Sequence, residues 1–111
     1  MAYRIQFMVT DTEYKQLLKE TAEAGYSSCS ALCYSRAFPN SKASSMYSEL
    51  ITKVAGRTPE EGPFVIRDIL KRPYPGVVGV WFSEAITKGN ISNVKALGRN
   101  NTKGAAEYIK L

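Results

Sequence analysis

Few side chains in this 111-residue sequence have the type and spacing that catalysis or metal binding requires. The sequence has no histidine, which excludes Ser-His and Cys-His nucleophile pairs, an imidazole base and most catalytic zinc sites. Its two cysteines, Cys29 and Cys33, are four residues apart, a spacing that strains a disulfide within a helix. We expect them to be small apolar residues on a buried helix face, and we expect no enzymatic activity, cofactor or metal.

The side chains that do suggest a function are basic. Fifteen Lys and Arg residues outnumber ten Asp and Glu residues, which gives a net charge of +5. Residues 1–62 contain seven basic and seven acidic side chains, whereas residues 63–111 contain eight basic and three acidic ones. The whole excess therefore lies in the C-terminal 49 residues, and it favours an anionic partner, most commonly nucleic acid.

The N-terminal part has the pattern of a strand followed by three helices. Apolar and polar residues alternate over residues 3–9, which predicts a strand with Arg4, Gln6 and Met8 on one face. Thr10 and Glu13 have the spacing of a capping box, and Gly25 ends the helix that they begin. Ser27 and Ser28 predict the N-cap of a second helix, which ends before Pro39. Ser44 or Ser45 is predicted to cap a third helix over residues 46–54.

The pattern changes after a predicted linker over residues 57–62, in which Glu60 and Glu61 are expected to be solvated. A short strand over residues 64–66, a helical turn over 67–71 and a helix over 76–88 are predicted next. The apolar stripe of that helix is predicted to contain Val77, Val80, Trp81 and Ala85, with Val78, Phe82 and Ile86 beside it. Two strands over residues 91–97 and 105–111 then enclose a polar, basic hairpin tip over 98–104.

The order of a strand, a capped helix, a Gly-Tyr-Ser-Ser turn and a second helix over residues 3–38 resembles the ribbon-helix-helix family, which includes repressors of the Arc and MetJ type. In that family, two chains pair their N-terminal strands into a ribbon that enters the major groove. The resemblance implies a homodimer in which Arg4, Gln6 and Met8 face the bases and Ser27 and Ser28 lie against a phosphate. On residues alone, Arg4 and Gln6 equally fit the solvent face of a simple dimer strand.

Residues 63–111 are similar to a small winged-helix-like domain of unknown function found in bacterial, plasmid and phage proteins. The similarity is carried by Phe64–Leu70, Val80–Ile86 followed by Gly89-Asn90-Ile91, and the segment from Leu97 to Tyr108. The short, proline-rich stretch after Leu70 favours the hairpin wing over a recognition helix as the main DNA contact. Basic wing tips enter minor grooves or contact phosphates, and at least one of the tip asparagines is expected to serve the turn itself.

We therefore expect an α+β protein with a ribbon-helix-helix-like dimerisation segment with an extra helix over residues 1–56, a linker over 57–62 and a winged-helix-like module over 63–111. The predicted DNA contacts are Arg99, Lys103, Asn100, Asn101, Lys95, Lys71, Arg72, Arg4, Gln6 and Ser28.

The predicted function is sequence-specific binding of double-stranded DNA by a cytoplasmic homodimer of a mobile element. Such a protein acts as a transcriptional regulator, or as a relaxosome accessory protein beside a relaxase at a plasmid origin of transfer. The alternative is a protein-interaction module, such as an antitoxin or a phage inhibitor of a host nucleic-acid enzyme. No apolar run approaches the roughly 20 residues of a membrane span.

Overall fold

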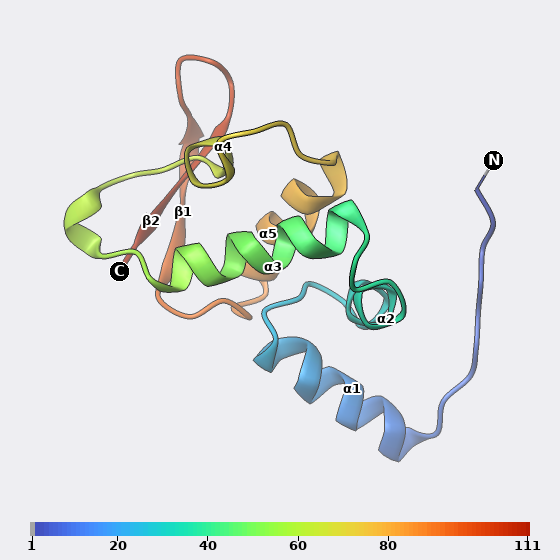
Figure 1. The fold of residues 1–111 in the computed structure, drawn as a ribbon. Coiled ribbons are helices and arrows are strands. Elements are labelled where there is room, and N and C mark those ends of the chain that lie inside the picture. The colour runs from blue at the N-terminus through green and yellow to red at the C-terminus, as the bar shows by residue number, and fades with distance from the viewer. Residues whose placement is uncertain (1) are drawn as a thin grey trace.

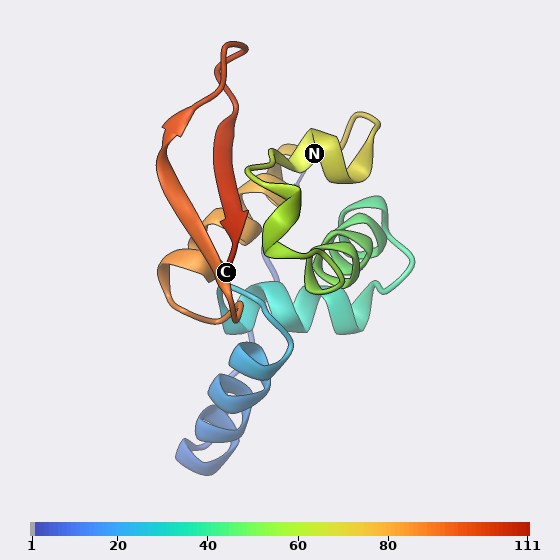
Figure 2. The ribbon, with the colours of Figure 1, turned by 90° about the vertical axis from the view of Figure 1, so that its left-hand side faces the viewer.

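The computed structural model describes residues 2–111 as a small α+β domain with five α-helices, one 3-10 turn and a two-stranded antiparallel sheet (Figure 1). The elements are α1 (Asp11–Glu23), α2 (Cys29–Ala37), α3 (Lys42–Ala55), the 3-10 turn η1 (Pro59–Glu61), α4 (Ile66–Leu70), α5 (Gly76–Thr87), β1 (Val94–Asn100) and β2 (Ala106–Lys110). The hairpin tip and α1 project from opposite ends of the molecule in both views (Figures 1 and 2).

The helix starts follow local capping chemistry. Thr10 and Glu13 form the predicted capping box, with hydrogen bonds of 3.2 and 2.8 Å in the two directions. Ser28 accepts a hydrogen bond from the amide of Ala31 and caps α2, as predicted. The predicted cap of α3 is wrong, because Ser41 caps this helix while Ser44 is buried within its first turn.

The hydrophobic core is formed by α3 together with the elements that follow it. Tyr47, Leu50 and Val54 of α3 pack in one cluster with Phe64 before α4 and Phe82 of α5. Tyr108 of β2 closes the cluster, and its ring meets that of Phe82 edge to face. Because α3 supplies so much of this core, it packs with the C-terminal half although it precedes the linker.

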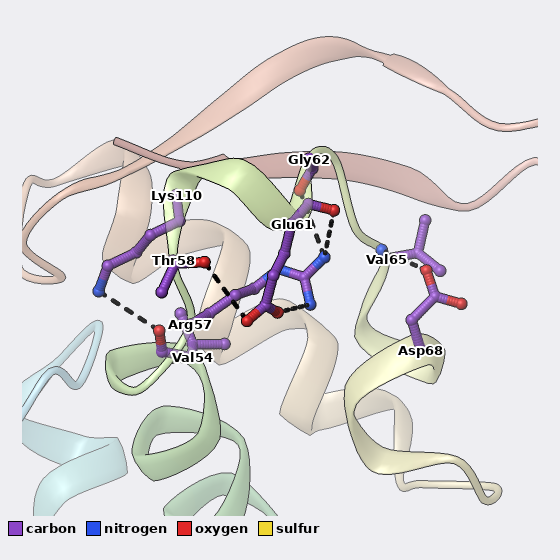
Figure 3. Close-up of polar contacts among 8 residues, drawn as sticks. All are labelled: Val54, Arg57, Thr58, Glu61, Gly62, Val65, Asp68 and Lys110. Atoms are coloured by element: carbon purple, nitrogen blue, oxygen red, sulfur yellow. Dashed lines mark hydrogen bonds and ion pairs between the residues drawn. The ribbon is translucent and has the colours of Figure 1, made fainter.

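The segment between α3 and α4 is held by hydrogen bonds (Figure 3). The guanidinium of Arg57 pairs with Glu61 at 2.9 Å, donates to the carbonyl of Gly62 and lies 4.8 Å from the centre of the Phe64 ring. Lys110 donates to the carbonyl of Val54 at the end of α3. These contacts hold residues 57–62, the predicted linker, in a fixed position, and Glu61 is ion-paired there.

Three predictions for the C-terminal half need correction. Phe64 forms an isolated bridge with Tyr108, but Ile66 already begins α4, so no strand spans 64–66. The strands are displaced to Val94–Asn100 and Ala106–Lys110, because residues 91–93 form a turn with Asn93 at φ +60°. The buried stripe of α5 consists of Val78, Phe82 and Ala85, which leaves Val77 and Val80 exposed.

Residues 2–10 have no secondary structure in the single chain. Their apolar side chains are open to solvent: Tyr3 is 82%, Ile5 84% and Phe7 67% exposed. The strand predicted here is absent because a strand needs a hydrogen-bonded neighbour, and no other strand among residues 2–111 pairs with this segment. Beside it, the free cysteines Cys29 and Cys33 are half-buried, so they are less enclosed than predicted.

The turn between α1 and α2 is held by side chains from α3 and from the end of α5. Three consecutive carbonyls accept these bonds: Gly25 from Tyr47 at 2.6 Å, Tyr26 from Asn90 at 2.9 Å and Ser27 from Lys88. The rings of Tyr26, Tyr47 and Trp81 pack together beside them. Burial raises the pKa of Tyr47, so its hydroxyl remains a donor throughout the physiological range.

Replacing Tyr47 by Phe removes the buried hydroxyl and leaves the Gly25 carbonyl without this donor. We expect the free energy of unfolding, measured by urea titration, to fall by about 1–3 kcal/mol. Tyr14→Phe is the matched control, because Tyr14 is 51% exposed and its hydroxyl has no hydrogen-bond partner among residues 2–111. Equal stabilities of the two variants would contradict the proposed importance of the bond.

Candidate nucleic-acid interface

Half of the basic side chains in residues 63–111 are engaged within the protein. Arg72 binds both oxygens of Glu49 at 2.8 and 3.0 Å, and Arg99 pairs with Glu107 at 3.2 Å across the hairpin. Lys88 donates to the Ser27 carbonyl, and Lys110 donates to carbonyls at the end of α3. The sequence-based charge count therefore overstates how many cations are available to a partner.

The other four basic side chains are exposed and form no ion pair within residues 2–111. They are Arg67, Lys71, Lys95 and Lys103. Lys95 lies on β1, and Lys71 ends α4 with a left-handed backbone at φ +60°. Arg67 lies in the first turn of α4 and Lys103 in the hairpin turn. Within residues 63–111, these four basic side chains remain available to an anion.

A groove of about 460 Å³, here called the basic groove, brings two of these cations together. Arg67 and Lys103 line it, together with Tyr74 and the hairpin turn over residues 101–105. Asp68 also lines it, and its carboxylate accepts a hydrogen bond from the amide of Val65 at 3.2 Å. This bond, drawn in Figure 3, fixes the first turn of α4 and hence the position of Arg67.

The hairpin turn has its shape because of Asn101. The side-chain oxygen of Asn101 accepts hydrogen bonds from the amides of Lys103 and Ala105, each at 2.9 Å. Gly104 completes the turn with φ +82°. Asn101 therefore serves the turn, and Lys103 is presented from a fixed loop.

The structure separates the sequence-predicted contacts into two groups. Lys103, Asn100, Asn101, Lys95 and Arg99 lie on the hairpin, whereas Arg4, Gln6 and Ser28 belong to the N-terminal part, with Arg4 and Gln6 on the exposed segment before α1. Of the loop residues, Lys71 is exposed and Arg72 is bound to Glu49. The segment before α1 runs along the side of the molecule away from the hairpin, so these groups form two separate surfaces (Figure 1).

Arg67 is a candidate contact that the sequence alone did not indicate. The residue counted toward the basic C-terminal half, but nothing in the sequence linked it to the hairpin. The link is the bridge between Phe64 and Tyr108, whose two backbone hydrogen bonds of 2.8 Å bring the chain before α4 against β2. Pairings of residues 44 positions apart have no local sequence signal.

Comparison of the chain with known protein families, curated proteins and solved structures gave no match. Within residues 2–111 no helix is both long and apolar enough to cross a membrane. The same residues contain no group of three or more His, Cys, Asp or Glu side chains able to hold a metal ion.

The pairing of Glu49 predicts a pH dependence of stability. Its hydrogen bonds to Arg72 and then to Lys53 lower the pKa of the carboxyl group from 4.5 to about 2. The unfolded chain therefore binds the proton more tightly, and acid favours unfolding. We expect the stability advantage of the wild type over Glu49→Gln to be full above pH 4.5 and to disappear as the pH falls toward 2.

Urea unfolding of both proteins between pH 7 and pH 2.5 measures this difference, and the comparison cancels the titration of groups that they share. Glu60→Gln is the control, because Glu60 is exposed and has no ion pair within residues 2–111. A wild-type advantage that stays constant down to pH 2.5 would show that the Glu49 pairs do not stabilise the fold.

Proposed function

We propose that this protein is a cytoplasmic homodimer that binds double-stranded DNA. The observation that carries the proposal is the basic groove, in which Arg67 and Lys103 line one opening from two different elements and neither is neutralised by an ion pair. Cations held at fixed positions attract phosphates, and phosphate contacts supply much of the affinity of DNA-binding proteins. Lys71 and Lys95 extend the positive charge beyond the groove.

The order of elements supports a winged-helix-like arrangement of the C-terminal half. After α3 come the bridging residue Phe64, the helices α4 and α5, and the hairpin of β1 and β2. This is the order in which winged-helix modules place their three helices and their wing. In such an arrangement the hairpin contacts the DNA backbone or a minor groove.

The N-terminal part supports a ribbon-helix-helix-like dimer. The exposed apolar side chains of residues 3–9 precede two capped helices, and a second copy of the segment offers the strand partner that the single chain lacks. Pairing of two segments would cover Tyr3, Ile5 and Phe7. It would leave Arg4 and Gln6 on the opposite face, where Arg suits guanine and Gln suits adenine.

In the cell, such a dimer would regulate transcription of a mobile element or mark a plasmid origin of transfer for a relaxase. Both roles require the binding of repeated half-sites by paired copies. The alternative, an antitoxin or phage inhibitor that binds a host protein, requires no affinity for DNA. It is therefore distinguished by the absence of duplex binding at low salt.

A salt series with a 24-base-pair duplex tests which surface binds. We expect Arg67→Ala combined with Lys103→Ala to weaken binding about tenfold or more near 0.1 M salt. The slope of log K against log salt should fall by about 2, since each lost phosphate contact lowers it by nearly 1. Fluorescence anisotropy gives both quantities.

Arg4→Ala with Gln6→Ala tests the N-terminal surface in the same assay. Lys15→Ala with Lys42→Ala is the matched control, because both lysines are exposed and form no ion pair within residues 2–111. Equal weakening by the control pair and the groove pair would contradict a specific role for the basic groove. The absence of any duplex binding by the wild type would contradict the proposed function.

The dimer is tested by sedimentation equilibrium. We expect the wild type to have twice the chain mass of 12.3 kDa, and Ile5→Asp with Phe7→Asp to have the chain mass itself. Charges at these positions would be buried between the paired segments at high cost. Met8→Asp, on the opposite face of the segment, should remain dimeric; a wild type that stays monomeric at all concentrations would contradict the dimer.

A further inference from the structure

Two free thiols lie one turn apart at the start of α2. Cys29 and Cys33 are both half-buried, and residues four apart on a helix lie on one face with their Cβ atoms about 5–6 Å apart. The Sγ atom of Cys29 lies 3.6 Å from the hydroxyl oxygen of Thr21 on α1, which places this thiol at the contact between the two helices. The proposed DNA binding uses neither thiol.

The spacing of the two thiols suits a bound metal ion better than a disulfide. A disulfide needs Cβ atoms about 3.5–4.5 Å apart, which is shorter than the roughly 5–6 Å between these helical positions. Two thiolates bound to one metal ion, each at roughly 2.3 Å, can have their sulfur atoms up to about 4.6 Å apart, so the Cβ atoms keep the helical spacing. A metal ion can therefore join the two sulfurs while α2 remains a helix.

A third sulfur donor borders the same space. Cys29 and Cys33 line a hollow of about 480 Å³, and Met8 lines it from the segment before α1. The side chain of Met8 is 98% exposed, so almost no packing contact holds it in place. A methionine side chain has three rotatable bonds, and its thioether can turn toward the thiols without a loss of packing.

The lining of the hollow selects a soft metal ion. Among residues 2–111, no Asp, Glu, Lys or Arg lines it. Ca²⁺ and Mg²⁺ rely on carboxylate oxygens, and structural zinc sites need four ligands from Cys, His, Asp or Glu, so the donors present suit neither. Thiolate and thioether ligands together select Cu(I).

We propose that Cys29, Cys33 and Met8 form a binding site for Cu(I). The ion replaces the protons of both thiols, so two protons are released for each ion bound and no electron is transferred. The loaded site has one net negative charge, which water can solvate because both cysteines are only half-buried. Because one donor is a methionine, the set differs from metal sites of three or more His, Cys, Asp or Glu, of which residues 2–111 contain none.

Competition with bicinchoninate, a chelator that forms a coloured complex with Cu(I), tests the site in the reduced chain without oxygen. We expect the wild type to withdraw one Cu(I) per chain. Cys29→Ser and Cys33→Ser should each lower the affinity about 100-fold or more, since even residues that only support a metal ligand contribute about 10–100-fold. Ser30→Ala is the matched control, because Ser30 lines the same hollow and should not contribute to the affinity.

The third ligand is tested by the methyl signals of ¹³C-methionine-labelled protein. On addition of Cu(I), the Met8 signal should shift, whereas the signal of Met46, which is 2% exposed in the core, should not. Met8→Leu keeps the apolar bulk and removes the sulfur, and it should lower the affinity about tenfold, which is less than the loss of a charged thiolate.

Two results would overturn the proposal. Equal competition by the wild type and by the Cys29→Ser, Cys33→Ser double variant would exclude the thiols as ligands. An unshifted Met8 signal at full loading would exclude the three-sulfur site. The Met8 signal is measured on the wild-type protein, so this test holds even where a cysteine variant fails to fold.

Discussion

The arrangement of this protein depends on three consecutive carbonyls of the α1–α2 turn, each bound by a side chain from a distant part of the chain. Tyr47, Asn90 and Lys88 donate to Gly25, Tyr26 and Ser27. Turn carbonyls next to a hydrophobic core must find donors, and here the donors come from α3 and from the end of α5. The turn that positions α2 is thereby fixed to the C-terminal half.

A second long-range contact builds the basic surface. The bridge between Phe64 and Tyr108 lies before α4 and brings that helix beside the hairpin. Arg67 and Lys103 then line one groove although they are 36 residues apart in sequence. Other basic side chains of the C-terminal half bind partners within the protein and are not available to DNA. These are Arg72, Arg99, Lys88 and Lys110.

Local signals in the sequence predicted the helices well. Thr10 with Glu13 and Ser28 define the starts of α1 and α2, and α5 begins at the predicted Gly76. The cap of α3 was misplaced because several serines precede that helix and only backbone geometry selects Ser41. The predicted apolar stripe of α5 differs from the face that is buried. The first turns of this helix are apolar on every side, so periodicity cannot identify the buried face.

The candidate site was only partly predictable for the same reason. Lys103 could be found because a glycine-flanked polar segment between two strands indicates a hairpin tip. Arg67 could not be linked to it, and the engagement of Arg72 by Glu49 depends on the packing of α3 against the loop after α4. The ribbon over residues 3–9 depends on a second chain, which no contact within one copy can supply.

The basic groove is the proposed DNA surface. Amide chemical shifts of the ¹⁵N-labelled protein, titrated with a 24-base-pair duplex at low salt, locate the surface that binds. We predict shifts at residues 67–71 and 101–105, with none at residues 52–55 near the end of α3. Shifts confined to other residues, or none at all with duplex in excess, would contradict this proposal.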